Sequence, residues 1–346
     1  MPVQYEPFNP SSDVTTTKTL LHEVIPITGS IVSGTYSDGN IKNYSHGMFQ
    51  SVYDYPYLSS SANHIFDITV GYDETSALSG SGIQNAKKIN LYNQYAQVLL
   101  GYTSSANDGV RKFERDLSLD LVGAMKEVFF INFSRLITKD QIKKGSFALS
   151  LGTGSVFTDA FNDVDLVLQD HEATETSGFS SQNPGGEYGV LYTSSVNIGP
   201  NSGVGNIFYQ AGIAVVTASV FGPSVLVDAA GHNISGVLTG SAISGACDAL
   251  RHRIQNLTFN NTTEINSKIY FCRVPSNKFN YSANPTYISG AAIRVKNLDE
   301  TANPIAYITT VGLYSTSGEL LATAKLSEPL RKDPTNELLL RVRLDY

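Results

Sequence analysis

Residues 145–250 contain no lysine and no arginine, although the whole chain carries 24 of these residues. The same 106 residues hold nine Asp and Glu and 16 of the 29 glycines. Short β-prone runs alternate there with Gly, Pro, Asn and Ser, which is the pattern of short strands joined by turns. This stretch predicts a Gly/Ser-rich β domain, folded as a sandwich or an open layer.

The regions on either side of that stretch differ from it in composition. Residues 1–60 are rich in Thr, Ser, Tyr, Pro and Gly and predict an extended N-terminal arm or loop region. Their aromatic run at residues 51–58 fits either an arm that lies on another surface or a local satellite core. Residues 61–144 predict a mixed helix and strand region, and residues 251–346 a C-terminal antiparallel β region.

Two helices are expected in the mixed region. Over about residues 84–100 apolar side chains recur at spacings of three and four, and Gly101 follows as a C-cap. A second helix is expected over about residues 117–128. With a strand at residues 64–71 and further strands beyond residue 128, the fold class is mainly β with a few helices (α+β), built from antiparallel sheets or a sandwich.

The last hundred residues have the most regular strand pattern. Residues 306–314 and 319–326 flank Ser-Thr-Ser-Gly, which predicts a hairpin with Gly318 near the position that needs a positive φ. We expect a charge at Leu313 or Leu321 to abolish assembly if this sheet forms a core or an interface. A terminal strand is expected over residues 338–344, with its leucines and valine alternating with two arginines.

Charge and hydropathy exclude several classes of function. Charged residues make up 16% of the chain, below the usual quarter, so the surface suits a subunit that is buried against neighbours. The net charge is −7 and no basic run exceeds two residues, which argues against nucleic-acid binding. The pairs Lys87–Lys88, Lys143–Lys144 and Arg331–Lys332 are expected to be solvated. No secretory signal and no membrane-spanning stretch is visible, so we expect a soluble chain made in the cytosol.

Side chains that carry chemistry are present but not in productive patterns. The six histidines, at 22, 46, 64, 171, 232 and 252, do not pair at zinc spacing, and Cys247 and Cys272 are expected to be small buried groups. An acidic cluster lacks the spacing of a calcium loop and is expected to be a solvated loop; it comprises Asp159, Asp163, Asp165, Asp170, Glu172 and Glu175. The sequence therefore predicts no catalytic, cofactor-binding or metal-ligating residue, and no cofactor.

Nucleophile and phosphate-binding motifs are also missing, including Gly-x-Ser-x-Gly and the Walker A sequence. Paired carboxylates for glycan cleavage need no sequence motif, so a glycan- or peptidoglycan-degrading enzyme stays open as a hypothesis, behind the two given below. The absence of tryptophan makes a sugar site less favoured. We expect the chain not to be an enzyme.

Five runs of the chain have a familiar sequence: Asn85–Ala96, Phe130–Arg135, Asp140–Phe147, Phe279–Thr286 and the hairpin Tyr307–Leu326. They resemble a family of virion structural proteins of contractile-tailed phages, notably those that infect cyanobacteria. The resemblance covers about residues 50–346 and carries no catalytic motif, so it transfers no site.

The resemblance implies a non-enzymatic structural subunit of the virion, in the tail, baseplate or neck. Its expected partners are other phage virion proteins and copies of itself, without nucleic acid, membrane or a small-molecule substrate. Its expected location is the virion, after synthesis in the cytoplasm of a bacterial host. The alternative is a host-receptor-binding or fibre-attachment module, since Tyr-, Ser- and Gly-rich loops make adaptable contact surfaces.

Overall fold

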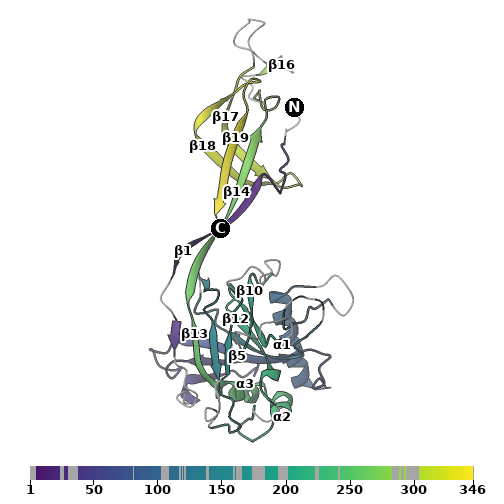
Figure 1. Ribbon diagram of the computed structural model, residues 1–346, viewed down its shortest axis with the longest axis vertical. Helices are drawn as coiled ribbons and strands as arrows, with labels where there is room; N and C mark the ends of the chain where they lie inside the picture. Colours follow the sequence, from purple (N-terminus) through teal and green to yellow (C-terminus); the bar gives the residue numbers. More distant parts are fainter. Residues whose placement is uncertain are drawn as a thin grey trace. The chain divides into compact units, whose positions relative to one another are not determined.

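The structure is a computed structural model that describes most of the chain in two compact units (Figure 1). It describes residues 5–23, 27–29, 38–80, 82–102, 109–116, 118, 120, 122–137, 140–158, 160, 166–173, 184–193, 202–222, 226–240, 242–282, 288–289, 292–293 and 304–345. Unit 1 is formed by Met1–Leu20 and Glu264–Tyr346, and unit 2 by Leu21–Thr263.

Unit 2 contains, within its described residues, a seven-stranded antiparallel sheet and a four-stranded one. The first has the order β10 (Tyr188–Leu191), β11 (Gly205–Phe208), β12 (Ile213–Thr217), β6 (Glu127–Asn132), β5 (His64–Tyr72), β4 (Gln50–Tyr53) and β3 (Ile41–Asn43). The second has the order β2 (Ile27–Gly29), β13 (Ile254–Phe259), β8 (Ala148–Leu151) and β9 (Leu166–Gln169). The helical segments of this unit are η1 (Asp38–Asn40), α1 (Ile83–Leu99), η3 (Ala218–Val220), α2 (Ile234–Thr239) and α3 (Ile243–Arg251).

The seven-stranded sheet is buried on both faces, which explains the unbroken apolar run at residues 128–131. Because side chains alternate along a strand, neighbours on β6 enter different cores. Phe129 joins a cluster with the four-stranded sheet and α3, while Phe130 joins a cluster with α1. A strand covered on both sides needs apolar residues at every position.

Helix α1 packs unusually close to β5 because Gly71 has no side chain. A Cβ atom at Gly71 would lie 2.9 Å from both the carbonyl oxygen of Lys88 and the backbone nitrogen of Tyr92. The buried face of α1 carries Tyr92, Ala96 and Leu99, each without solvent exposure. The three-and-four spacing of the sequence therefore marks the face that covers the sheet.

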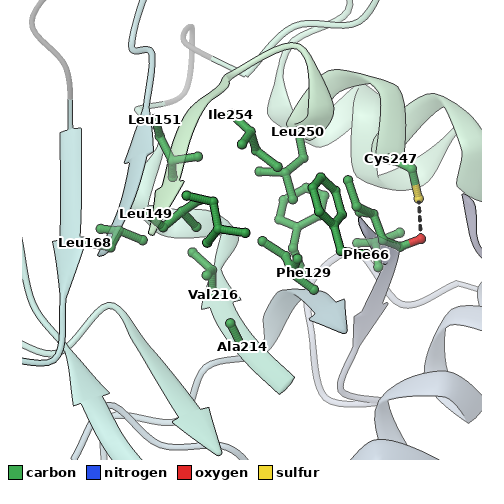
Figure 2. Packing of buried hydrophobic residues seen from close by; sticks show 14 of the residues in the cluster. Phe66, Phe129, Leu149, Leu151, Leu168, Ala214, Val216, Cys247, Leu250 and Ile254 are labelled. Atoms are coloured by element: carbon green, nitrogen blue, oxygen red, sulfur yellow. Dashed lines mark hydrogen bonds between the residues drawn. The ribbon is translucent and has the colours of Figure 1, made fainter. Parts of the chain in front are cut away.

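Figure 2 shows the opposite core, where residues from both sheets meet α3. Phe66 and Phe129 of the large sheet lie near Leu250 and Ile254, and Leu149 comes from the small sheet. This cluster has more buried residues than the one beneath α1, and burial of apolar area is the main favourable term in folding.

Unit 1 is made of strands, and its described residues form three groups. The strands β1 (Val14–Glu23), β14 (Asn261–Val274) and β19 (Leu338–Asp345) pair in that order. The strands β17 (Ala306–Tyr314) and β18 (Leu320–Lys332) form a separate two-stranded sheet, and β15 (Ile288–Ser289) pairs with β16 (Ala292–Ile293). The first residues of β14 still belong to unit 2, where Asn261 and Thr262 pair with β7 (Gln141–Ile142).

The β17–β18 hairpin turns at residues 315–318, where Gly318 has φ +87°, as its sequence predicted. Its register shifts twice, between the pairs Ile308–Leu330 and Thr310–Lys325, and again beside the turn. The first shift leaves residues 326–329 of β18 without partners on β17, so the hairpin is irregular in its middle.

The predicted fold class is confirmed, because the structure is mainly β with antiparallel sheets and a few helices. The expected helix at residues 84–100 is α1, and the expected strand at 64–71 is β5. The strands at 306–314 and 338–344 also lie where the alternation placed them. In each of these elements the predicted pattern extends over seven residues or more.

The predicted second helix at residues 117–128 is wrong for the residues of that range that the structure describes. Asp116 and Asp120 each accept a hydrogen bond from the backbone nitrogen two residues later, which favours turns over helix. Glu114 and Ala124 form an antiparallel bridge, and β6 starts at Glu127. The segment is thus a hairpin-like connection.

The middle of the chain contains two helices that the sequence analysis did not predict, α2 and α3. The side chain of Asn233 accepts a hydrogen bond from the backbone nitrogen of Gly236 at 3.1 Å and caps α2. One of the β-prone runs of this stretch, at residues 224–227, falls partly outside the described residues, and its Leu226 and Val227 are not in a strand.

The four segments expected from composition do not correspond to the two units. Strands from 61–144 and from 145–250 share the seven-stranded sheet, so the stretch without cations is not a separate sheet domain. The described part of residues 38–53 forms the β3–β4 edge of the same sheet. The amino-acid composition changes near residue 145, but no unit boundary lies there, because the seven-stranded sheet contains strands from both sides of that position.

Candidate functional site

We first consider the groups that could perform chemistry. Of the acidic cluster, Asp159, Asp163, Asp165 and Glu175 lie outside the described residues. Within the part of the chain that is described, no group of three His, Cys, Asp or Glu side chains is placed to hold a metal ion. The helices described there include none long and apolar enough to cross a bilayer.

Asp170 is buried at the end of β9 and serves a structural purpose. Its carboxylate accepts hydrogen bonds from the backbone nitrogens of Gly145 at 2.8 Å and Phe147 at 3.1 Å, and from the hydroxyl of Tyr209 at 3.0 Å. Burial raises the pKa of Asp170 to about 6. This aspartate is therefore not the solvated loop residue that the sequence indicated.

We expect the Asp170→Asn variant to show a pH dependence of stability different from that of the unmodified chain. Because the folded pKa lies above the ordinary value of 3.8, the folded state holds the Asp170 proton more tightly between about pH 4 and pH 6. The stability of the unmodified chain relative to Asp170→Asn should therefore fall across this range, by about 3 kcal/mol, and level off above it. Urea unfolding of both proteins from pH 4 to pH 7 measures the difference, and a constant difference would contradict this assignment.

A serine, an aspartate and a histidine meet across β4 and β5, but in an order that does not activate the serine. Ser51 donates to the Asp67 carboxylate at 2.5 Å, and His64 Nε2 lies 2.7 Å from the same oxygen. A catalytic triad needs the imidazole between the hydroxyl and the carboxylate. Here the Asp67 carboxylate lies between the hydroxyl and the imidazole, so the Ser51–Asp67 hydrogen bond links β4 to β5 and does not activate the serine.

Two lysines expected to be solvated are instead fully buried. In unit 2, Lys88 Nζ donates to the carbonyl oxygens of Leu238 and of Gly240, which ties the end of α2 to α1. Burial lowers the pKa of Lys88 to about 8. In unit 1, Lys332 Nζ donates to the carbonyl oxygen of Ser276 and to other oxygens nearby.

The two cysteines are free, and Cys247 is buried as expected. Its sulfur donates to the carbonyl oxygen of Ile68 at 3.3 Å, the dashed contact in Figure 2. Burial raises the pKa of the Cys247 thiol, which keeps it protonated and unreactive at neutral pH. Cys272, on β14 of unit 1, is half-buried.

Unit 1 differs from unit 2 in how its residues are buried. Both hydrophobic core clusters consist of residues of unit 2. Among the described residues of unit 1, the buried apolar side chains are Ile269, Val274, Ala306, Leu313 and Val342, and each keeps 7–8% of its surface exposed. A sheet with so little buried apolar surface has a small hydrophobic contribution to its stability.

In unit 1, whose described residues form no hydrophobic core cluster, polar contacts join segments that are far apart in the sequence. The Arg273 guanidinium lies 2.8 Å from the Asp13 carboxylate, and Lys278 lies 2.6 Å from Glu6. The carboxylate of Asp345 accepts a hydrogen bond from Ser267. Largely exposed ion pairs contribute little to stability, so these contacts do not replace a core.

Several large apolar side chains of the hairpin and of the N-terminal segment are exposed instead. We define the hairpin patch as Tyr5, Tyr314 and Leu320. The rings of Tyr5 and Tyr314 pack edge to face at 5.1 Å, and Tyr314 pairs with Leu320 across the strands. All three residues are exposed, Leu320 by 53%. Contiguous exposed apolar side chains of this kind mark interaction sites more than single ones do.

The structure also separates the two hairpin leucines that the sequence treated alike. Leu313 is 7% exposed, whereas Leu321 is 68% exposed. Leu313 pairs with Ala322 and Tyr314 with Leu320, and the register shift between these pairs leaves Leu321 without a partner on β17. One leucine thus belongs to the fold of unit 1 and the other to its surface.

A second exposed apolar segment lies in unit 2, directly after β4. Tyr55 is 57% exposed, Tyr57 37% and Leu58 85%. Tyr53 contacts both the Tyr57 ring and the His64 ring. The aromatic run at residues 51–58 was expected to be either an arm that lies on another surface or a local satellite core. In the structure Tyr55, Tyr57 and Leu58 are exposed, while Tyr53 belongs to β4.

No protein-family model matches the chain, and no curated protein or solved structure is significantly similar to it. The function therefore has to be inferred from the surface just described.

Proposed function

We propose that this chain is a non-enzymatic structural subunit of a phage virion, in the tail, baseplate or neck. It assembles there with other virion proteins and with copies of itself. The observation that carries the proposal is the contrast between the units. Unit 2 has two hydrophobic cores, while the hairpin of unit 1 exposes Tyr307, Tyr314, Leu320 and Leu321. Such a unit gains buried apolar surface when it binds neighbours.

The resemblance to virion proteins of contractile-tailed phages supports the same proposal, since its matching runs include the hairpin itself. The low charge content also supports it, because each charge buried at an interface needs a partner.

Fractionation of purified particles tests the proposal. Particles of the phage that encodes this chain should be banded on a density gradient, dissociated, and quantified by mass spectrometry against the tail and capsid proteins. We expect a fixed copy number of the chain per particle. Its absence from intact particles would end the proposal.

The exposed tyrosines after β4 favour a second candidate, a host-receptor-binding or fibre-attachment module. Tyr55 and Tyr57 offer large rigid contact surfaces of the kind that binding loops use. An antibody raised against residues 54–60 should then reduce adsorption of the phage to its host. Full adsorption with the antibody bound to the particles would contradict this candidate.

A further inference from the structure

The two strands of the β17–β18 hairpin protect their edges differently. Strand β18 carries four charged residues, a proline at position 329 and the register shift described above. Lysines, prolines and bulges on a strand are the usual means of preventing its edge from pairing with another chain. Strand β17, with the sequence AYITTVGLY, has no charge, no proline and only residues that suit a strand, apart from Gly312.

In the part of the chain that the structure describes, β17 pairs with β18 alone. A two-stranded sheet leaves one side of each strand without ladder partners, so backbone N–H and C=O groups of β17 point away from β18. Thr309 and Thr310, at the middle of the strand, have exposed side chains. An edge that is uncharged, extended and nine residues long fits the addition of another strand.

The charges of the chain indicate a second copy as the added strand. Unit 1 has 11 Lys and Arg against 10 Asp and Glu, whereas unit 2 has 13 against 21. Two copies therefore repel each other through unit 2 but not through unit 1. An uncharged strand also pairs with its own copy without placing like charges opposite one another, which Lys325 and Arg331 would do on β18.

We propose that β17 pairs antiparallel with β17 of a second copy, about a two-fold axis, so that two hairpins form one four-stranded sheet. This inference rests on the proposed structural role and specifies one of its contacts. In the register that uses all nine residues, Thr310 lies opposite Thr310 of the other copy.

Charge exchange at the middle of β17 tests the pairing. We compare the unmodified chain, Thr309→Lys/Thr310→Lys and Thr309→Glu/Thr310→Glu by sedimentation velocity at about physiological salt, where charges at contact are not fully screened. The matched control is Thr323→Lys, an exposed threonine on β18 of the same hairpin. Circular dichroism verifies that each variant keeps the strand content of the unmodified chain.

We expect the unmodified chain and Thr323→Lys to dimerise equally. Each double variant alone should dimerise about tenfold more weakly, because like charges then face each other. An equimolar mixture of the Lys and Glu variants should recover the dimer. A partner other than a second copy would give no such recovery.

Three results would overturn the inference: a monomeric unmodified chain at all concentrations, double variants that dimerise as well as the unmodified chain, or an equal loss in Thr323→Lys. None of these results bears on whether the chain is found in purified particles. The proposed function fails only if it is absent there, so the two failures can be told apart.

Discussion

Leu313→Asp and Leu321→Asp are expected to prevent incorporation into particles for two different reasons. Leu313 is buried in unit 1, so an aspartate there places an uncompensated charge in a poorly hydrated position, at a cost on the order of 3 kcal/mol. Unit 1 has little core from which to offset this cost. Leu321 is exposed, so Leu321→Asp should leave the isolated chain folded and remove only an apolar contact with neighbours.

Hydrogen exchange of the isolated proteins separates the two cases. We expect Leu313→Asp to lose protection over β14, β17 and β18, and Leu321→Asp to exchange like the unmodified chain. Complementation of a phage that lacks the gene then measures particle yield with each variant. A normal yield with Leu321→Asp would show that this leucine does not lie at an interface.

Phe130→Ala should destabilise unit 2 by about 3–5 kcal/mol. The Phe130 ring is fully buried between β6 and α1, stacked on Tyr95 at 4.1 Å and edge-on to Phe113 at 5.6 Å. Its removal leaves a cavity that neighbouring elements cannot fill, because Gly71 already holds α1 at its closest approach to β5.

Urea denaturation with segment-resolved hydrogen exchange measures the effect. The control is Val98→Ala, a change on the exposed side of α1 that should alter stability by less than about 0.5 kcal/mol. A loss below about 1 kcal/mol for Phe130→Ala would contradict the two-core description of unit 2.

Local periodicity was sufficient to predict α1, β5, β17 and β19, because each keeps one regular repeat along most of its length. It failed at residues 117–128, where two aspartates form turns with their own backbone and override the helical pattern. It also missed α2 and α3, although the cap at Asn233 was a usable signal, because Gly and Ser around them lower helix propensity.

The sequence predicted the hairpin that carries the candidate site, but not which of its side chains are exposed. The hairpin and its turn follow from the sequence, whereas the two register shifts between its strands do not. Likewise, Lys88 and Lys332 can be buried because carbonyl oxygens far away in the sequence accept hydrogen bonds from their Nζ atoms. Contacts between residues far apart in the sequence leave no local pattern.

We propose that the exposed hairpin of unit 1 becomes buried against neighbouring subunits in a phage particle. Hydroxyl-radical footprinting of purified virions, compared with the free protein, tests it most directly. We expect Tyr307 and Tyr314, which are 64% and 43% exposed in the free chain, to be protected in the virion, while Tyr102 serves as an internal reference. Equal oxidation of both hairpin tyrosines in the particle and in the free chain would contradict the claim.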